Sequence, residues 1–342
     1  MKLNYKRFDL PCRHPFTISR GSTTVQQTVV VELAQEGCRG YGEAIHCPFY
    51  GATVEGIAAA LERVRPMVES WCLDDPIPFW EAVRGELAAE TFTLAALDMA
   101  AYDLWGKLRR QPVWKLLGFS LEGCPPSDYT IGIDTTEVML RKMAEFPGWP
   151  VYKIKLGTPD DLAIVRALRA HTDALFRVDA NCAWDVEETI RNAAALAELG
   201  VEFIEQPLPR ERWDEARAVF ARAALPIIAD ESCQAEEDVE RCAGAFHGVN
   251  VKLAKCGGIT PARRMLTRAR RMGMKTMVGC FTESSVGISA AAQLLPLLDY
   301  ADLDGAVLLG EDVARGVAID RGRIRFPEEN GCGVTLLDTD AG

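Results

Sequence analysis

The sequence predicts an α/β fold: a closed barrel of alternating strands and helices with a smaller α+β domain beside it. Its 342 residues exceed one ordinary core and suit a barrel of roughly 250 residues plus a second domain. Between Tyr129 and Gly305, eight short apolar runs alternate with segments of helical spacing. Eight such units favour a closed barrel over an open doubly wound sheet, and the missing GxGxxG after the first run counts against a dinucleotide fold.

The chain before residue 125 predicts the smaller domain, because strand patterns come first and helical patterns follow. Residues 25–33 form a β-branched run, YGEAI continues as a short strand, and residues 53–71 and 91–117 have the apolar spacing of helices, the last with Pro112 as an interruption. The hairpin-like GVAIDRGRIRFP indicates that the tail returns to this domain. The predicted parts are an α+β domain over 1–124, a barrel over 125–312 and a C-terminal segment over 313–342.

Composition counts against several classes of protein. The net charge of −11 disfavours a nucleic-acid partner, because phosphate binding needs clustered Lys and Arg. The start has no apolar signal core, and no stretch is long and apolar enough to span a membrane. The eleven cysteines are scattered singly and are odd in number, which favours reduced thiols in a cytoplasmic protein.

Charged residues stand at the ends of several predicted barrel strands. A buried apolar strand does not finish in a charge unless the charge has a partner. In a barrel, these strand ends meet at one rim, and active sites of barrel enzymes lie at that rim. The sequence therefore gathers lysines and carboxylates around one small space.

Three of these charged residues predict a metal site. Asp179, Glu205 and Asp230 end three consecutive strands, each about one βα unit from the next. Hard oxygen ligands from neighbouring strands suit Mg²⁺. For each residue alone, the alternative is a helix cap or an ion-pair partner. Three carboxylates in register at the same strand end favour the metal site.

Lysines stand on both sides of the predicted rim. Lys153 and Lys155 are two residues apart and face the same side of one strand, whereas Lys252 comes from a strand across the barrel. A carbon acid held between two lysines loses its proton to one and regains a proton from the other. Burial, a second lysine and a divalent cation would each lower the lysine pKa from about 10.4. The alternatives are an outward-facing strand edge for the first two lysines, and Lys255 in place of Lys252.

These residues, in this order, resemble the enolase superfamily and, within it, the muconate-lactonising subgroup with its Lys-x-Lys motif. The resemblance covers nearly the whole chain and rests on YGEA, LAALDMAAYDLWGKLRRQPVWKLLG, YKIKLG, RVDANCAW, FIEQPL, IADES and NVKLAKCGGIT. It implies a (β/α)₇β TIM-like barrel with an α+β capping domain made from both chain ends. It also implies Mg²⁺ on the three carboxylates, Lys155 and Lys252 as acid/base groups, and Lys153 as a support for the substrate carboxylate.

The eighth predicted strand carries Asp302 and Asp304, two residues apart on one side. This Asp-x-Asp resembles the signature of the subgroup's dipeptide epimerases, where it would hold the α-ammonium group of the substrate. Paired anionic acceptors in a dry site are suited to a cationic amine. An N-cap or a solvated turn before Gly305 is the alternative.

The resemblance implies an isomerase: a Mg²⁺-dependent dipeptide epimerase that moves a proton at the α-carbon of the C-terminal residue through an enediolate. Other activities of the subgroup stay open, namely an N-acylamino acid racemase, a muconate cycloisomerase or an o-succinylbenzoate synthase. A non-catalytic homologue that binds small acids is a further alternative, although a pure binder has no need for opposed bases. Subgroup relatives are often oligomeric, which favours a homo-oligomer.

Two capping loops, HPFTISRGS and HCPFYGAT, are expected to contact the second side chain of the dipeptide. Their candidate residues are His14, Phe16, Ile18, Arg20, Phe49 and Tyr50. Arg20 would meet an acidic side chain or else form a surface ion pair. Glu283, after the seventh predicted strand, would pair with one of the lysines or cap the helix that follows.

Overall fold

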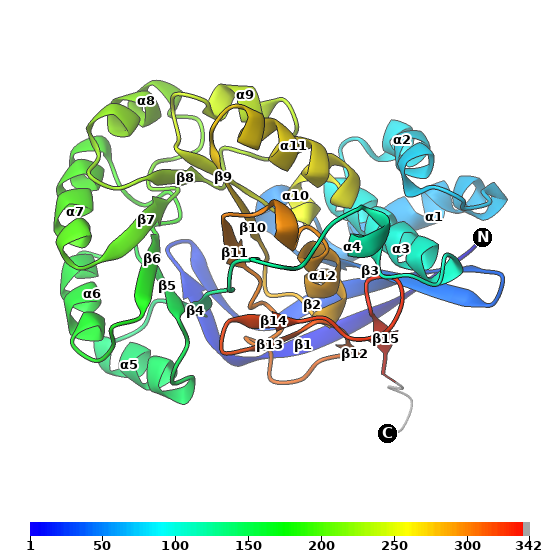
Figure 1. Cartoon of the computed structure of the whole chain (residues 1–342), viewed down its shortest axis with the longest axis horizontal. Helices are drawn as coiled ribbons and strands as arrows, with labels where there is room; N and C mark the ends of the chain where they lie inside the picture. Colours follow the sequence, from blue (N-terminus) through cyan, green and yellow to red (C-terminus); the bar gives the residue numbers. More distant parts are fainter. Residues whose placement is uncertain (338–342) are drawn as a thin grey trace.

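The structure, a computed structural model, describes residues 1–337 and contains the predicted barrel (Figure 1). Its eight strands are parallel, and each is hydrogen-bonded to its neighbours in chain order. They are β4 (Tyr129–Ile131), β5 (Val151–Lys155), β6 (Leu175–Asp179), β7 (Val201–Glu205), β8 (Ile227–Ala229), β9 (Gly248–Val251), β10 (Lys275–Gly279) and β11 (Tyr300–Asp302). Each strand lies within one of the eight apolar runs, so the predicted fold class is confirmed.

The barrel closes at a seam between β4 and β11 that depends on a side chain. One parallel bridge, from Ser127 to Ala301, joins the two edges, and the Asp128 N–H donates to the Ala301 carbonyl over 3.2 Å. The buried Arg177 guanidinium donates to the same carbonyl over 3.0 Å and to the Asp128 carboxylate over 2.9 Å. Closure at this point fixes the next residue, Asp302, at the rim.

Helices cover the outside of the barrel, and Figure 1 shows α5 to α9 as an outer ring. The helices of this part are α5 (Thr136–Glu145), α6 (Asp161–Arg169), α7 (Val186–Glu198), α8 (Trp213–Arg222), α9 (Asp238–Cys242), α10 (Leu253–Cys256), α11 (Ile259–Arg271) and α12 (Ser285–Ala292), followed by a 3₁₀ turn at Leu295–Leu297. Their inner faces are apolar at helical spacing; α6, for example, buries Ile164, Val165 and Leu168 in the core. The outer ring thus seals the strands from water.

The chain before residue 125 forms a three-stranded antiparallel sheet with helices packed on it. Its elements are β1 (Lys2–Ile18), β2 (Gly21–Gln35), β3 (Cys38–Ile45), a 3₁₀ turn (Pro48–Tyr50), α1 (Val54–Ser70), α2 (Pro76–Leu87), α3 (Thr91–Leu108) and α4 (Val113–Leu116). The predicted strands and helices are present, with the expected break before α4. Neither β1 nor α2 follows from the sequence patterns. In β1 the reason is a register shift between Pro11 and Phe16 and polar exposure along most of its length.

Two glycines allow β3 to lie directly on α3. A Cβ atom at Gly42 would overlap the backbone of Ala96 and Ala100 in α3, and one at Gly40 would overlap Ala100 and Leu104. Both glycines lie on one side of the strand because they are two residues apart. The two glycines of β3 are therefore what allows the strand and the helix to approach so closely.

The C-terminal tail contacts both parts of the chain. It contains β12 (Ala314–Arg315), β13 (Ala318–Asp320), β14 (Arg323–Arg325) and β15 (Thr335–Leu336), and β13 and β14 form a hairpin. The Asp103 carboxylate of α3 accepts the Cys332 N–H over 2.8 Å. The Gly322 carbonyl in the hairpin turn accepts the Ser127 N–H at the start of the barrel over 2.9 Å. The domain limits after residues 124 and 312 stay a prediction.

Two further findings concern composition. All eleven cysteines are free thiols, as their scattered spacing suggests. Within residues 1–337, every helix is either too short or too polar to cross a lipid bilayer.

We expect Gly42→Ala to destabilise the protein by about 1–3 kcal/mol, because the added methyl group forces β3 away from α3. Gly85→Ala is the matched control: Gly85 lies inside α2 with open space around its Cα, so alanine should stabilise that helix by roughly 0.5–1 kcal/mol. Melting temperatures of the two variants and the unsubstituted protein measure both effects. Equal melting temperatures for the two variants would contradict the direct packing of β3 on α3.

Candidate active site

A pocket of about 750 Å³ lies between the barrel rim and the first domain. The carboxyl ends of barrel strands face it, which is where barrel enzymes place their active sites. The predicted site residues that line it are Lys155, Asp230, Lys252, Asp302 and Asp304 from the barrel, and Phe16, Ile18, Arg20, Phe49 and Tyr50 from the first domain. The pocket therefore brings together residues that are far apart in the sequence.

Three buried carboxylates form one cluster beneath this pocket. Asp179 and Glu205 are the last residues of β6 and β7 and are directly paired in register, while Asp230 follows the last residue of β8. One carboxylate oxygen from each lies within 4.8 Å of the others. The regular advance of one strand per carboxylate, which the sequence spacing predicted, places all three on the same side of the rim.

The donor set of this cluster fits a Mg²⁺ ion. All three ligands are hard carboxylate oxygens, which Mg²⁺ prefers. Among the described residues, Asn181 Oδ1, Glu231 Oε2 and Asn250 Oδ1 near this cluster accept no hydrogen bond, and Glu205 Oε2 has only the ion pair with Lys153 Nζ at 2.8 Å. Buried polar oxygens of native proteins are usually satisfied, so this local group of unsatisfied oxygens points to a cation with its bound waters.

The ionisation of the three carboxylates differs. Burial opposes the ionisation of each, but Lys155 and Lys153 lower the pKa of Asp179, and Lys252 and Lys255 hold the pKa of Asp230 well below its usual range. Burial and the neighbouring charge of Asp179 raise the pKa of Glu205 to about 7. Asp179 and Asp230 are therefore ionised at neutral pH, whereas at Glu205 burial and the neighbouring carboxylates outweigh the charge of Lys153, whose Nζ lies 2.8 Å from Glu205 Oε2.

Unusual backbone conformations beyond the strand ends help to orient the carboxylates of the cluster. Asn181 and Gln206, just beyond β6 and β7, have positive φ angles of 44° and 34°. The Asn181 N–H donates to Asp179 Oδ1 over 2.9 Å, which is the local side-chain-to-backbone turn that Asp favours. The Gln206 side chain accepts the N–H of Asp230 over 2.9 Å. Such strained residues at strand ends are typical of functional sites and here orient the cluster.

Lys155 and Lys252 approach the pocket from opposite walls. In the strand order of the barrel, β5 and β9 are four positions apart in a ring of eight. Lys155 Nζ lies 2.6 Å from Asp179 Oδ2, and Lys252 Nζ lies 3.0 Å from Asp230 Oδ2. Both ammonium groups therefore flank the carboxylate cluster, with the open pocket above it.

Burial lowers the pKa of the buried lysines as expected, but neighbouring carboxylates reverse the net direction for Lys252 and Lys153. Burial does lower the pKa of Lys252, but the charges of Asp230 and Glu205 outweigh burial and raise that pKa above its ordinary value. For Lys153, burial is likewise outweighed, chiefly by Asp302, and its pKa is raised well above the usual range. The sequence argument underestimated the effect of the carboxylates on the lysine pKa, because several carboxylates lie around each of these two lysines.

The structure separates the roles of Lys252 and Lys255. Lys255 does not line the pocket; its ammonium group is buried and donates to Asp230 Oδ1 and to the carbonyls of Cys233 and Asn250. Each proton of the ammonium group therefore has a protein acceptor. Lys252 lines the pocket, so it is the lysine of this strand that can meet a substrate.

Asp302 and Asp304, at the end of β11, line another side of the pocket. Lys153 Nζ donates to Asp302 Oδ2 over 2.7 Å, and the Thr130 N–H donates to Asp304 Oδ2. Burial opposes the ionisation of Asp302, but Lys153 and Lys155 lower its pKa to about 2. Burial and the charge of Asp302 raise the pKa of Asp304 to about 7. A cation placed between the two aspartates would satisfy both, because it supplies the positive charge that Asp304 lacks.

The first domain closes the pocket through Arg20. Its guanidinium lies 2.7 Å from Glu231 Oε1, donates to the Asn181 carbonyl over 3.0 Å and stacks 4.5 Å from the centre of the Phe49 ring. Arg20 is thus neither free nor in a surface ion pair, since Glu231 is buried. Tyr50 packs edge-on against Phe49, with ring centres 4.9 Å apart, so the aromatic residues form one wall.

Two expected contacts differ in the structure. His14 Nε2 lies 2.7 Å from Glu145 and is outside the pocket lining. Glu283 also lies outside the lining: it accepts the Phe281 N–H over 2.9 Å, and Ser284 rather than Glu283 caps α12. Glu283 makes no ion pair with a lysine among the described residues, because the loop turns its carboxylate toward Glu43, and burial and Glu43 raise its pKa to about 8.

Asn250 is a site residue that the sequence reasoning missed. Its Nδ2 donates to Glu205 Oε1 over 2.8 Å and so orients a carboxylate of the cluster. The signal was available: Asn250 stands two residues before Lys252 in VNVK, so both project to the same side of the strand.

Comparison with known proteins agrees with this geometry. The family described as “Mandelate racemase / muconate lactonizing enzyme, N-terminal domain” matches residues 4–118, and the family described as “Enolase C-terminal domain-like” matches residues 137–341.

Relatives match along nearly the whole chain. The chain is 50% identical to the L-Ala-D/L-amino acid epimerase of Flavobacterium johnsoniae over 337 residues, 98% of this chain and 100% of that protein. It is 39% identical to the L-Ala-D/L-Glu epimerase of Bacteroides thetaiotaomicron, over 98% of this chain and 88% of that protein. The structure of the dipeptide epimerase of Enterococcus faecalis V583, complexed with Mg and the dipeptide L-Leu-L-Tyr, is 30% identical with a TM-score of 0.91 over 98% of this chain and 99% of that one. The chain therefore belongs to the enolase superfamily, in its mandelate racemase and muconate lactonizing enzyme group.

Proposed function

We propose that the protein is a Mg²⁺-dependent dipeptide epimerase, an isomerase that inverts the α-carbon of the C-terminal residue. The observation that carries this proposal is the placement of Lys155 and Lys252 on opposite walls of one pocket. The paired aspartates Asp302 and Asp304 at the side of the same pocket add the selectivity for a free amine.

Different residues would bind the ion, the substrate carboxylate and the ammonium group of the dipeptide. Asp179, Glu205 and Asp230 would hold the ion, and Lys153 would support the substrate carboxylate from below. Asp302 and Asp304 would accept hydrogen bonds from the α-ammonium group of the first residue, which fixes the dipeptide at both ends. The second side chain of the dipeptide would be surrounded by Phe16, Arg20 and Tyr50.

Proton transfer then needs one lysine in each charge state. The neutral lysine, Lys155 or Lys252 according to the epimer bound, takes the α-proton from its own side. The other lysine, still protonated, delivers a proton to the opposite face, so the configuration inverts and the enzyme ends with its charges exchanged. Bound Mg²⁺ would neutralise the carboxylates that raise the pKa of Lys252 and would stabilise the enediolate charge on the substrate carboxylate.

The other activities of the group fit the pocket less well. An N-acylamino acid, muconate or a succinylbenzoate precursor has no ammonium group at this place. Such a substrate would set a neutral or anionic group beside Asp302 and Asp304 and leave the buried Asp302 charge without a second partner. A non-catalytic binder would gain nothing from opposed lysines. Uptake of deuterium at the α-carbon, tested with a dipeptide library and with N-succinyl amino acids, distinguishes a dipeptide epimerase from the other activities of the group and from a non-catalytic binder.

Two broader expectations accompany this proposal. Eleven free thiols favour a reducing compartment, in keeping with a cytoplasmic enzyme. A homo-oligomer, expected from the habits of the subgroup, stays a prediction.

Lys155→Ala and Lys252→Ala are each expected to lower epimerisation by about 10²–10⁴-fold or more, because each removes one of two acid/base groups. Dipeptide binding, measured by calorimetry, should persist. Each variant should still exchange deuterium into at most one epimer, the one whose α-proton faces the remaining lysine. Lys275→Ala, at the exposed start of β10, is the control and should match the unsubstituted enzyme. Full epimerisation by either pocket variant would remove the two-base mechanism.

Asp302→Asn is expected to lower kcat/KM for dipeptides by roughly 10–100-fold, since a charge-assisted hydrogen bond to the ammonium group becomes a neutral one. Turnover of N-succinyl amino acids, where measurable, should not fall with it. Steady-state kinetics with both substrate classes test this. An equal loss for both classes would assign Asp302 a purely structural role.

We expect Mg²⁺ to bind more tightly as the pH rises through about 7, because the raised pKa of Glu205 lets a proton compete with the ion. Below that pH, affinity should fall about tenfold per pH unit. Calorimetric titration with Mg²⁺ measures the dependence. Glu205→Gln should flatten it and weaken binding, whereas Asp304→Asn, which removes another carboxyl group with a pKa of about 7, should keep it. A flat profile in the unsubstituted protein would contradict competition between the ion and a proton on Glu205.

A further inference from the structure

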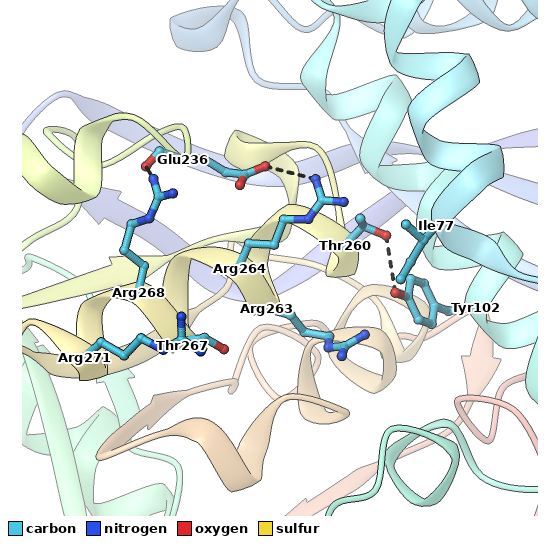
Figure 2. Close-up of a pocket in the computed structure, with 9 residues that line it drawn as sticks. All are labelled: Ile77, Tyr102, Glu236, Thr260, Arg263, Arg264, Thr267, Arg268 and Arg271. Atoms are coloured by element: carbon cyan, nitrogen blue, oxygen red, sulfur yellow. Dashed lines mark hydrogen bonds and ion pairs between the residues drawn. The ribbon is translucent and has the colours of Figure 1, made fainter.

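A second pocket, separate from the candidate active site, lies where α11 meets the first domain. It has a volume of about 360 Å³ (Figure 2). Its lining consists of Ile77 on α2, Tyr102 on α3, Glu236 before α9, and Thr260, Arg263, Arg264, Thr267, Arg268 and Arg271 on α11. Four guanidinium groups around one pocket are unusual in a chain whose net charge is −11.

Helix α11 is the source of this positive charge. Its thirteen residues, ITPARRMLTRARR, include five arginines and no acidic residue. Three of the arginines lie in the last turn, where the negative end of the helix dipole stabilises a cation. Arg263 and Arg264 lie near the other end, where the dipole gives a cation no stabilisation. The dipole therefore does not account for the whole cluster.

Neighbouring carboxylates neutralise only part of the charge. Arg264 lies 3.0 Å from Glu81 and 3.5 Å from Glu236. Arg268 lies 3.0 Å from Glu240. Within residues 1–337, no carboxylate lies within ion-pair distance of Arg263 or Arg271, the remaining two arginines of the lining.

Arg263 is half-buried and is bordered by neutral hydroxyl groups. Its guanidinium reaches the Tyr102 hydroxyl, which lies 3.3 Å from Thr260 Oγ1. Thr260 in turn donates through its hydroxyl and its N–H to the buried Asp98 carboxylate, over 2.9 Å and 2.8 Å. Among the described residues, Asp98 is thereby hydrogen-bonded to Thr260 and makes no ion pair with Arg263. A partly desolvated cation without an anionic partner is costly, which marks this end of the pocket as a place for an anion.

We propose that the pocket binds a small polyanion that carries at least two phosphate or carboxylate groups. Arg263 and Arg271 are eight residues apart, about 12 Å along the helix axis at 1.5 Å per residue, so two linked anionic groups suit them better than one simple anion. Two linked anionic groups would meet both uncompensated guanidinium groups, and bidentate arginine contacts favour phosphate or carboxylate oxygens. Figure 2 shows the arginine side chains spread along α11, with Tyr102 and Ile77 at one end of the row.

The test is calorimetric titration of the Mg²⁺-loaded protein with tripolyphosphate and, separately, with citrate. Free Mg²⁺ is kept in excess of the probe so that chelation does not strip the protein. We expect one of the two probes to bind one site per chain, with an affinity that falls as salt is added. Arg263→Gln and Arg271→Gln should each weaken this binding about tenfold while dipeptide turnover stays unchanged.

Arg270→Gln is the matched control. Arg270 lies on the same helix and in the same last turn as Arg271, but it does not line the pocket, so its loss should change the affinity less than twofold. Tighter binding of tripolyphosphate would assign the site to phosphates, and tighter binding of citrate would assign it to carboxylates. Equal weakening by all three substitutions, or no binding of either probe to the unsubstituted protein, would overturn the proposal.

Discussion

Lys153 joins the two halves of the candidate active site. Its side chain is 1% exposed, and its ammonium group lies 2.7 Å from Asp302, 2.8 Å from Glu205 and 3.4 Å from Asp179. Burial of this cation is tolerable only because the carboxylates compensate its lost hydration, and it does the same for them. The proposed ion site and the proposed ammonium site therefore share one counter-charge, and neither can be changed without an effect on the other.

This shared charge does not stabilise all five carboxylates of the site equally. The lysines keep Asp179, Asp230 and Asp302 ionised, whereas Glu205 and Asp304 each have a pKa raised to about 7. Glu205 lies among the proposed ion ligands, and Asp304 lies beside the proposed position of the ammonium group. In both cases burial and a neighbouring carboxylate outweigh the nearby lysines, so an added cation would stabilise the ionised form. A metal ion and a dipeptide amine are two cations that would fill those places.

The sequence was sufficient for the groups whose position follows from strand geometry. Strand spacing predicted the carboxylate cluster, and the two-residue alternation predicted that Lys153 and Lys155 share a face. Groups whose position depends on loops were not predictable in this way. Glu283 turns toward Glu43, which comes from β3 in the other part of the chain, and nothing in the local sequence encodes that approach. The raised lysine pKa was missed for a related reason, since it depends on how many carboxylates converge in space.

The first domain contacts the barrel at the same strand ends, so the residues proposed to bind the ion also affect the substrate specificity of the pocket. Figure 1 shows the hairpin of β1 and β2 extending to the barrel beside β5 and β6. At its tip, Arg20 binds the carbonyl of Asn181, two residues beyond Asp179, and the buried Glu231, which follows Asp230. The cap is thus attached to the same strand ends that would hold the ion. An acidic substrate side chain would have to compete with Glu231 for Arg20, so the charge preference of the pocket depends on the barrel as much as on the cap.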